Sequence, residues 1–277
     1  MILVTGATGN IGSALLRELQ GAGAGPVRGL TRDAARASFP GEVEAVEGDL
    51  TEVAALKPVL DGVRSLFLVS GVGADADVLA AARQAGVEHV VLVSSMTVET
   101  HPHLAPAGEN LAVERLLQDS GMAWTILRPT QFTSNTLWWA ASIRAHRSVR
   151  APYADIGLPA IHPADIAAVA RTALTEPGHR GRTYALTGPA RVTPRQQVEA
   201  IGAALGEEVS LDEISREEAH RQMASFMADG TADAILDLMG GDVNDELLRV
   251  RDTVSQITGA PARTFQQWAR ENVAAFR

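Results

Sequence analysis

Apolar positions in the first half of the chain follow two alternating patterns. Short runs rich in Val, Ile and Leu alternate with alanine-rich segments in which apolar residues recur at helical spacing. These patterns predict strands over 1–5, 27–31, 43–47, 66–70, 89–94 and 124–127, and helices over 11–20, 53–60, 74–85, 109–119 and 132–144. Glycines follow several of the helices and suit a left-handed residue there: Gly21, Gly62, Gly86 and Gly121. We therefore expect a doubly wound (Rossmann) α/β fold with a parallel sheet of the 3-2-1-4-5-6 type.

The pattern loosens beyond residue 150, where Pro and Gly interrupt the chain repeatedly. Helices are predicted over 164–175, 194–205, 215–227 and 264–276, with Thr193 as the N-cap of the second and Ser215 at capping-box spacing from Glu218. We expect residues 1–150 to form the domain with the sheet. Residues 151–277 should form a smaller, mostly helical lobe that binds substrate and returns some elements to the main sheet.

Composition removes several classes of chemistry. The 277 residues include no Cys, which excludes disulfide scaffolds, cysteine-ligated zinc, iron–sulfur clusters and thiol nucleophiles. The formal net charge of −9 disfavours nucleic acid as a partner. No stretch approaches about 18 uncharged apolar residues, and the first residues lack a basic leader, so we expect a cytoplasmic protein without a membrane partner.

A glycine-rich turn follows the first predicted strand and opens the first helix. Its spacing is Gly6-x-x-Gly9-x-x-Gly12. Gly6 permits a tight turn, Gly9 lets the backbone approach a pyrophosphate, and Gly12 lets the helix pack on the strand. This context predicts that residues 1–150 form an NAD(P)-binding domain, in which the phosphates are held by Gly6, Thr8, Gly9, Asn10, Ile11 and Gly12.

The end of the second strand indicates which dinucleotide is bound. Arg32 occupies the place where an NAD-specific site carries an acidic residue, and its guanidinium suits a 2′-phosphate, so we predict NADP(H). The alternative is a solvated Arg next to Asp33, and Arg28 is interpreted as a surface residue. Asp49 is placed to accept from the adenine amino group, although a helix-capping role for Asp49 or Thr51 is equally compatible. The predicted cofactor set also includes Leu50, Ser70 and Gly71.

Several ordered motifs together resemble the NmrA-like branch of the atypical short-chain dehydrogenases/reductases. They are the glycine turn, Thr31-Arg32-Asp33, the stretch 127–135 beginning Leu-Arg-Pro-Thr, Asp165-Ile166-Ala167 and the stretch 184–189. The resemblance spans residues 1 to about 215. It implies NADPH-dependent reduction of quinones, dyes or phenolic ethers, or a regulator that binds the dinucleotide without catalysis. It also implies that Pro129, Thr130, Gln131 and Phe132 border the nicotinamide, whereas Phe132 alone is compatible with core packing.

The chain departs from the wider family in lacking its usual acid, a Tyr-x-x-x-Lys pair. Its tyrosines are Tyr153 and Tyr184, its single lysine is Lys57, and the helix after the fifth strand offers Asn110 and Glu114 instead. Hydride addition to a ketone gives an alkoxide whose conjugate acid has a pKa near 15.7, with water as proxy, against about 10 for a phenolate from a quinone. That difference is roughly 8 kcal/mol, and a positioned acid supplies only about 3–5 kcal/mol. Quinones, conjugated enones or dyes should therefore be favoured over simple ketones.

Weaker donors remain as candidate catalytic groups: His101, Ser95 and Asn110. His101 and His103 follow the fifth strand and could donate to an oxyanion, although surface-loop histidines are the commoner outcome, and no third ligand supports a metal site. Strand-end serines and threonines often cap the next turn, and Asn110 with Glu114 could equally form a solvated helix face. These alternatives apply to Ser94, Ser95, Thr97, Asn110 and Glu114.

The second half adds two weaker candidates. His162 is expected to order a turn rather than contact substrate. Trp138, Trp139, Met223, Phe226 and Met227 could cover an aromatic pocket, although core or subunit-interface packing is the more frequent role of such residues. The leading hypothesis is thus an NADPH-dependent oxidoreductase that transfers hydride to a small aromatic or quinone-like substrate, namely a quinone, an enone or an aromatic natural-product intermediate. A non-catalytic NADP(H) sensor is the rival, and a homodimer remains open.

Overall fold

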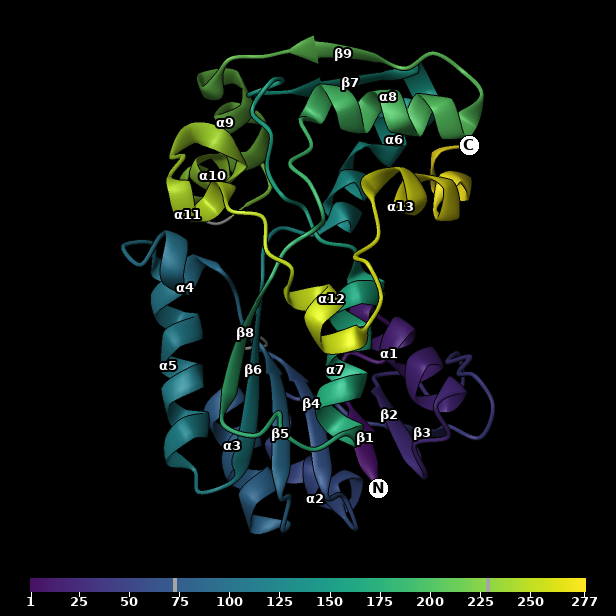
Figure 1. The fold of residues 1–277 in the computed structure, drawn as a ribbon, viewed down its shortest axis with the longest axis vertical. Coiled ribbons are helices and arrows are strands. Elements are labelled where there is room, and N and C mark those ends of the chain that lie inside the picture. The colour runs from purple at the N-terminus through teal and green to yellow at the C-terminus, as the bar shows by residue number, and fades with distance from the viewer. Residues whose placement is uncertain (72–73, 228–229) are drawn as a thin grey trace. The chain divides into compact units, whose positions relative to one another are not determined.

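The computed structural model describes residues 1–71, 74–227 and 230–277 (Figure 1). The chain divides into two compact units, each assembled from separate segments. The first unit comprises Met1–Pro129, Pro163–Leu186 and Thr253–Ala260, and the second comprises Thr130–His162, Thr187–Asp252 and Pro261–Arg277. The second unit begins at Thr130, whereas we expected a boundary at residue 150, and later segments return to the first unit as expected.

A seven-stranded parallel sheet forms the centre of the first unit. Its strands are β1 (Ile2–Val4), β2 (Val27–Thr31), β3 (Glu44–Glu47), β4 (Ser65–Val69), β5 (His89–Val93), β6 (Ala123–Pro129) and β8 (Arg182–Leu186). The order β3-β2-β1-β4-β5-β6-β8 contains the predicted arrangement of six strands, which confirms the fold class. β8 is additional, and its residues lack an apolar run because most of this edge strand is exposed or half-buried.

Helices cover both faces of this sheet (Figure 1). On one face, α1 (Asn10–Gly21) and α12 (Thr253–Thr258) pack against α7 (Pro163–Thr175). The other face carries η1 (Val53–Ala55), α2 (Leu56–Leu60), α3 (Asp75–Gln84) and α5 (Ala105–Asp119), while the short α4 (Thr97–Thr100) follows β5. Crossover helices on both faces are what parallel strands require.

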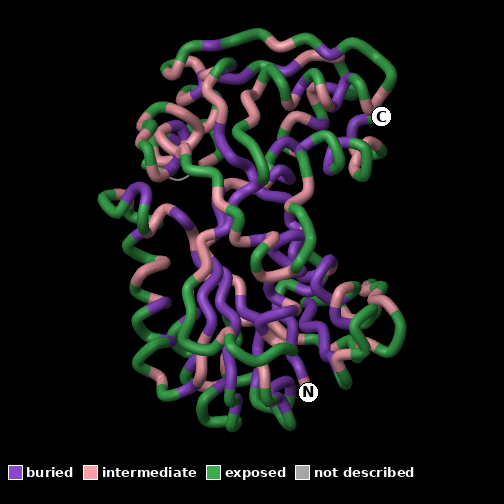
Figure 2. The backbone as a smooth tube through the Cα atoms, viewed as in Figure 1, coloured by how far each residue is buried: buried purple, intermediate pink, exposed green. Residues whose placement is uncertain are grey.

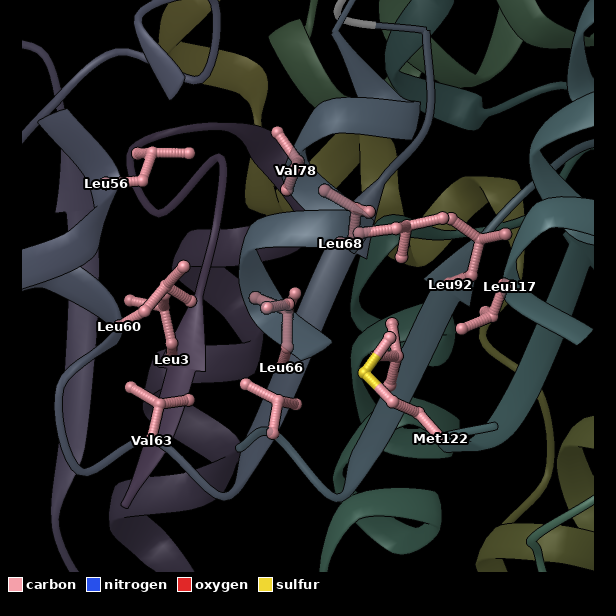
Figure 3. Close-up of a cluster of buried hydrophobic side chains, with 14 of the residues drawn as sticks. Leu3, Leu56, Leu60, Val63, Leu66, Leu68, Val78, Leu92, Leu117 and Met122 are labelled. Carbon is pink, nitrogen blue, oxygen red and sulfur yellow. The ribbon is translucent and has the colours of Figure 1, made fainter. Parts of the chain in front are cut away.

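The core on the α2–α3–α5 face explains why the strands read as continuous apolar runs (Figure 3). Leu66 and Leu68 of β4 point into it together with Val90 and Leu92 of β5, while the alternate residue Phe67 is equally buried outside this cluster. β4 and β5 therefore bury both of their faces, and Figure 2 shows the buried residues at the centre of this unit. Burial of this apolar surface is the main stabilising contribution to the sheet.

The second unit contains a separate core beneath a two-stranded parallel sheet. Its elements are η2 (Thr133–Trp139), α6 (Ala140–His146), β7 (Ser148–Ala151), α8 (Pro194–Leu205), β9 (Ser210–Glu213), α13 (Phe265–Glu271) and η4 (Val273–Phe276), with β7 paired to β9. Trp268 is the centre of this core, with its ring 5.4 Å from that of Phe265 and 6.1 Å from that of Phe276. The rings provide the bulk that a small helical unit needs.

A smaller cluster lies within the same unit. It involves α9 (Arg216–Ala224) and α10 (Thr231–Leu236), and the chain continues through the π-helical turn η3 (Asp237–Gly241) to α11 (Asp245–Leu248). Ile214, Ala219 and Leu236 are buried there, with Tyr153 and Met223 packed against them. In the described part of the chain, no helix is long and apolar enough to cross a membrane.

Local signals predicted some element boundaries and missed others. Thr193 caps α8 with the full capping box, and Ser215 accepts from the Glu218 amide as expected. Gly62, Gly86 and Gly121 are left-handed, but Gly21 is the last residue of α1 and the left-handed residue is Gly23. The predicted helix over 132–144 is instead a 3₁₀ segment followed by α6, and the helix predicted over 215–227 already ends at Ala224.

Candidate active site

The turn between β1 and α1 has the geometry of a phosphate cradle. Gly6 adopts φ +58°, and its carbonyl oxygen accepts from the Gly9 amide at 2.9 Å. A Cβ on Gly12 would lie 2.1 Å from the Gly6 oxygen, which excludes a side chain there, and one on Gly9 would lie 3.2 Å from the same oxygen, a tight approach. Gly9 caps α1 without a side-chain hydrogen bond, and the first turn contains no acidic residue.

These features fit a dinucleotide. The first amides of a helix lack partners within the helix and attract anions, and Gly6, Thr8, Gly9 and Asn10 are all exposed. An acidic side chain in this turn would have occupied or repelled the same position. The turn is therefore able to hold a pyrophosphate through backbone amides.

The other predicted cofactor residues gather at the same edge of the sheet. Because the strands are parallel, their carboxyl ends lie together. These ends carry Arg32 after β2, Asp49 and Leu50 after β3, Ser70 and Gly71 after β4, Ser95 after β5 and Pro129 at the end of β6. Thr130 and Phe132 follow in the second unit, where Thr130 is buried and Phe132 is half-buried and bridged to Ile161. The half-buried side chain leaves both interpretations of Phe132, a border of the nicotinamide site and core packing, as predictions.

Arg32 is exposed and makes no ion pair within the part of the chain that the structure describes. Its neighbour Asp33 pairs instead with Arg36, at 3.4 Å between the guanidinium and the carboxylate. Asp49 accepts from both the amide and the hydroxyl of Thr51, at 2.9 and 2.8 Å. These hydrogen bonds, with a smaller contribution from Arg32, hold the pKa of Asp49 below its ordinary value. Asp49 therefore orders its own turn, and its contact with adenine stays a prediction.

The interpretation of Arg28 as a surface residue is wrong. Arg28 is buried, with 9% of its area exposed. Its guanidinium pairs with Glu44 at 2.9 Å and donates to the carbonyl oxygens of Val59 and Asp61. Arg28 thereby ties β2 to β3 and to the end of α2, which leaves Arg32 as the cation at the ligand edge of this strand.

α5 brings two predicted residues together. The Ser70 hydroxyl lies 2.7 Å from Oδ1 of Asn110 and 2.9 Å from the carbonyl oxygen of Val93. Asn110 also donates through Nδ2 to the carbonyl of Pro106 at 2.8 Å. Its amide is thus oriented by its own helix and placed at the end of β4.

A buried charge network follows one helical turn later. Glu114 has 1% of its area exposed, so the interpretation of a solvated helix face is wrong for this residue. Its carboxylate accepts from Nε and Nη2 of Arg128 at 2.9 and 2.5 Å and from the Ser94 hydroxyl at 2.6 Å. Arg128 also pairs with Glu99 at 2.6 Å. The hydrogen bond with Glu114 raises the pKa of Arg128 above its ordinary value.

Residue spacing alone did not predict the ion pair between Glu114 and Arg128. The available signal was the four-residue interval between Asn110 and Glu114, together with a serine at the end of a buried strand. α5 is consequently tied to the carboxyl ends of β4, β5 and β6 by polar contacts. Asn110 and Glu114, four residues apart on this helix, both contact residues at strand ends, and their correspondence to the wider family's acid pair stays a prediction.

The other candidate donors differ in burial and in hydrogen-bond partners. His101 is fully buried, which makes the surface-loop interpretation wrong for it, and its Nδ1 lies 2.8 Å from the Thr100 hydroxyl. His103 is exposed, with its ring 5.8 Å from that of His101. Ser95 accepts from the amide and hydroxyl of Thr97 at 3.1 and 2.9 Å, so it orders the start of α4. The catalytic roles of His101, Ser95 and Asn110 stay predictions.

The two tyrosines each contact a nearby polar side chain, and they belong to different units. Tyr184 is on β8, with its hydroxyl 2.9 Å from Nδ1 of His179, and partial burial raises its pKa above the ordinary value. The hydroxyl of Tyr153 accepts from Arg216 at 3.1 Å. Lys57 is exposed on α2.

Among the second-unit candidates, His162 is buried and lies 3.2 Å from the Glu271 carboxylate of α13, and its role in ordering a turn stays a prediction. Trp139 and Met223 pack against the cores. Trp138 and Phe226 are 62% and 72% exposed, so core packing is wrong for these two, and the aromatic-pocket hypothesis stays a prediction.

A doubly wound sheet with a phosphate-cradling glycine turn defines a dinucleotide-binding protein, and comparison with known proteins agrees. Residues 6–177 match the model of the NAD(P)H-binding family. The chain is 40% identical to (4-alkanoyl-5-oxo-2,5-dihydrofuran-3-yl)methyl phosphate reductase of Streptomyces griseus, over 100% of this chain and 99% of that protein. It is 37% identical to the NAD(P)H azoreductase of Xenophilus azovorans, with the same coverage of both chains.

A solved structure is also similar. The NADPH-dependent quinone oxidoreductase QOR2 of Escherichia coli, complexed with NADPH, superposes with a TM-score of 0.82 and 28% identity over 98% of this chain and 99% of that one. The chain therefore belongs to the NAD(P)H-binding family, which confirms the resemblance to NmrA-like reductases. It is an NAD(P)H-dependent oxidoreductase that uses NADP(H), and this outcome favours the enzyme over the non-catalytic sensor.

Proposed function

We propose that the protein reduces flat, conjugated acceptors with NADPH, namely quinones and alkenes activated by two carbonyl groups. The observation that carries this proposal is the face of α5. Asn110 and Glu114 occupy positions four residues apart, as Tyr and Lys do in acid-bearing relatives, but they contact Ser70, Ser94 and Arg128. A reaction at this edge must therefore succeed with weak proton donors, and acceptors that delocalise the incoming charge satisfy that condition.

The relatives support this choice of acceptor. The dihydrofuranone named for the Streptomyces griseus enzyme carries its carbon–carbon double bond next to both a ring carbonyl and an alkanoyl carbonyl. Hydride addition to the far carbon of that double bond leaves negative charge that both carbonyls share. A quinone, as in the name of the Escherichia coli enzyme, gives a phenolate-like anion. In both cases, strong protonation during hydride transfer is unnecessary.

Each part of the site has an assigned role in this proposal. Bound NADPH supplies the hydride. The amides of the turn 6–12 bind its pyrophosphate, Arg32 binds the 2′-phosphate, and Asp49 contacts the adenine. Pro129, Thr130 and Phe132 border the nicotinamide. Ser95, His101 and Asn110 offer hydrogen bonds to the developing oxyanion, and a homodimer stays a prediction that light scattering would measure.

Steady-state turnover tests the proposal. NADPH oxidation is followed at the nicotinamide absorbance with a 2-acyl butenolide, a benzoquinone and an aliphatic ketone of similar size. We expect the value of kcat/KM for the conjugated acceptors to exceed that for the ketone by at least about a hundredfold. The two product anions differ by roughly 8 kcal/mol, and a positioned acid offsets at most about 5 kcal/mol of this, which leaves roughly 3 kcal/mol. Equal turnover of the ketone would contradict the proposal. Tight NADPH binding without turnover of any acceptor would support the sensor instead.

A further inference from the structure

The carboxylate of Glu47 lies at the turn that begins with Arg32. β3 pairs with β2 so that Glu47 is the partner of Thr31, and the Gly48 amide donates to the Thr31 carbonyl at 2.9 Å. Oε2 of Glu47 accepts from the Ala34 amide at 3.4 Å. Glu47 is exposed, so its charge faces solvent beside the segment predicted to bind the 2′ position of the ribose.

The other acidic residue of this turn is directed elsewhere. The Asp33 amide donates to the Thr31 hydroxyl at 3.3 Å, and the Asp33 carboxylate accepts from the Arg36 amide at 3.1 Å in addition to its ion pair with Arg36. Glu47 is therefore a carboxylate of this turn without an ion pair among the described residues, and it contacts the Ala34 amide two residues after Arg32. The Glu47 carboxylate thus already accepts from the Ala34 amide, which would otherwise be available to a phosphate at this turn.

Arg32 and Glu47 favour different ligands. A guanidinium binds a 2′-phosphate, whereas a carboxylate repels it and accepts a hydrogen bond from the 2′-hydroxyl of NADH. We propose that Glu47 is a second specificity-determining residue that opposes Arg32, so that the protein binds both dinucleotides and its preference for NADPH is limited by Glu47. This inference rests on the proposed function and names the residue that sets the cofactor range of the same site.

The test compares Glu47→Gln with a matched control, Glu42→Gln. Glu42 is also exposed, but it precedes β3 and thus lies at the amino end of the strand, away from Arg32. Dissociation constants of NADPH and NADH are measured by calorimetry for the wild type and both variants. We expect E47Q to bind NADPH about three- to tenfold more tightly, the effect of removing one exposed charge close to a phosphate, and to bind NADH no more tightly. E42Q should leave both constants within about twofold of the wild type.

The salt dependence of NADPH binding distinguishes an electrostatic effect of Glu47 from a steric one. The gain of E47Q should be present at about 0.1 M salt and should largely disappear at about 1 M, where the Debye length is roughly 3 Å. A preference that is unchanged in E47Q, that changes equally in E42Q, or that persists at high salt would overturn the inference. Failure of the wild type to bind either dinucleotide would instead refute the proposed function. Coincident thermal unfolding of E47Q and wild type excludes misfolding, and Glu47→Ala should reproduce the E47Q result.

Discussion

Gly12 has no space for a side chain, which gives a direct test of the phosphate turn. A Cβ there would lie 2.1 Å from the Gly6 oxygen, closer than Cβ atoms approach in real structures. Gly12→Ala must therefore displace the backbone, and we expect at least about a hundredfold loss of NADPH affinity by calorimetry because the cradle depends on that backbone.

The control lies in the same helix. Gly21 ends α1 without a left-handed conformation, and a Cβ at this position would meet no other atom within 4 Å, so Gly21→Ala should keep full affinity. It should also raise stability by up to about 0.5–1 kcal/mol, the usual gain of alanine over glycine within a helix. Retention of NADPH binding by G12A would refute the assignment of the turn.

Arg32 should discriminate between the two dinucleotides. Since its guanidinium has no ion-pair partner among the described residues, Arg32→Gln removes a charge without leaving a carboxylate unpaired. We expect NADPH affinity to fall about tenfold or more, with NADH affinity changed by less than about threefold. Arg36→Gln, which removes a cation paired with Asp33, is the control. An equal loss for both dinucleotides in R32Q would show that Arg32 does not read the 2′ position.

His89 should make stability depend on pH. It is buried at the start of β5 with Nε2 3.0 Å from the Thr125 hydroxyl, and burial, with Arg180 and His179, lowers its pKa from 6.5 to about 4. Between about pH 6.5 and pH 4 the unfolded chain therefore protonates His89 whereas the folded chain does not. The contribution of neutral His89 to the free energy of unfolding is complete above about pH 6.5 and is lost as the pH falls towards about 4. The loss amounts to about 3 kcal/mol.

Urea unfolding at several pH values measures this loss. His89→Gln is neutral in both states and should show a stability that falls by about 3 kcal/mol less than that of the wild type over the same interval. The variant His103→Gln, at an exposed histidine, serves as the comparison. Parallel pH profiles for H89Q and the wild type would contradict the assignment.

Residues with locally determined roles could be predicted from the sequence, and residues with long-range roles could not. The glycine turn and Arg32 follow from spacing after a strand, because a strand, a turn and a helix are contiguous in the chain. Arg28, His101 and Glu114 are charged or polar residues that the fold buries, and burial depends on partners distant in sequence such as Arg128. Composition favours exposure for such residues, so sequence-based interpretation placed them on the surface.

α5 depends on its buried ion pair. Replacing Glu114 with Gln leaves Arg128 without its bidentate carboxylate and weakens the contact with Ser94. Breaking one side of a buried pair is costly, so we expect the free energy of unfolding of E114Q to fall by about 3 kcal/mol in urea. Glu109→Gln on an exposed face of the same helix should change it by less than about 0.5 kcal/mol. Similar values for the two variants would show that the network contributes little to stability.

Two elements agree fully with their predicted bounds. β2 is a strand in which every residue is buried, and α8 begins at a capping box formed by Thr193 and Gln196 with Pro194 in its first turn. β8 was missed because an edge strand needs little apolar sequence. The segment predicted as one helix over 132–144 has helical spacing of apolar residues, but its first part winds as a 3₁₀ helix, a distinction that this spacing does not resolve.

Because each unit is assembled from separate segments of the chain, we expect a fragment that ends at residue 150 to fold poorly. Residues 1–150 lack α7, α12 and β8, so α1 loses α7, which packs against it, and β6 keeps β5 but loses its other neighbour. We expect this fragment to show no cooperative unfolding by circular dichroism and no NADPH binding, because apolar surface on that face would remain in water. A fragment that unfolds cooperatively and binds NADPH would show that the later segments are dispensable.

The chain changes unit after Pro129, His162, Leu186, Asp252 and Ala260. A chimaeric protein that takes one whole unit from a relative would consequently need a splice at every one of these points, each joining backbone that must meet without strain. Recombination rarely achieves that number of compatible junctions at once. New acceptor ranges in this lineage are therefore expected to arise through point substitutions and loop exchange within an intact framework, and directed evolution should sample those changes rather than exchange whole units.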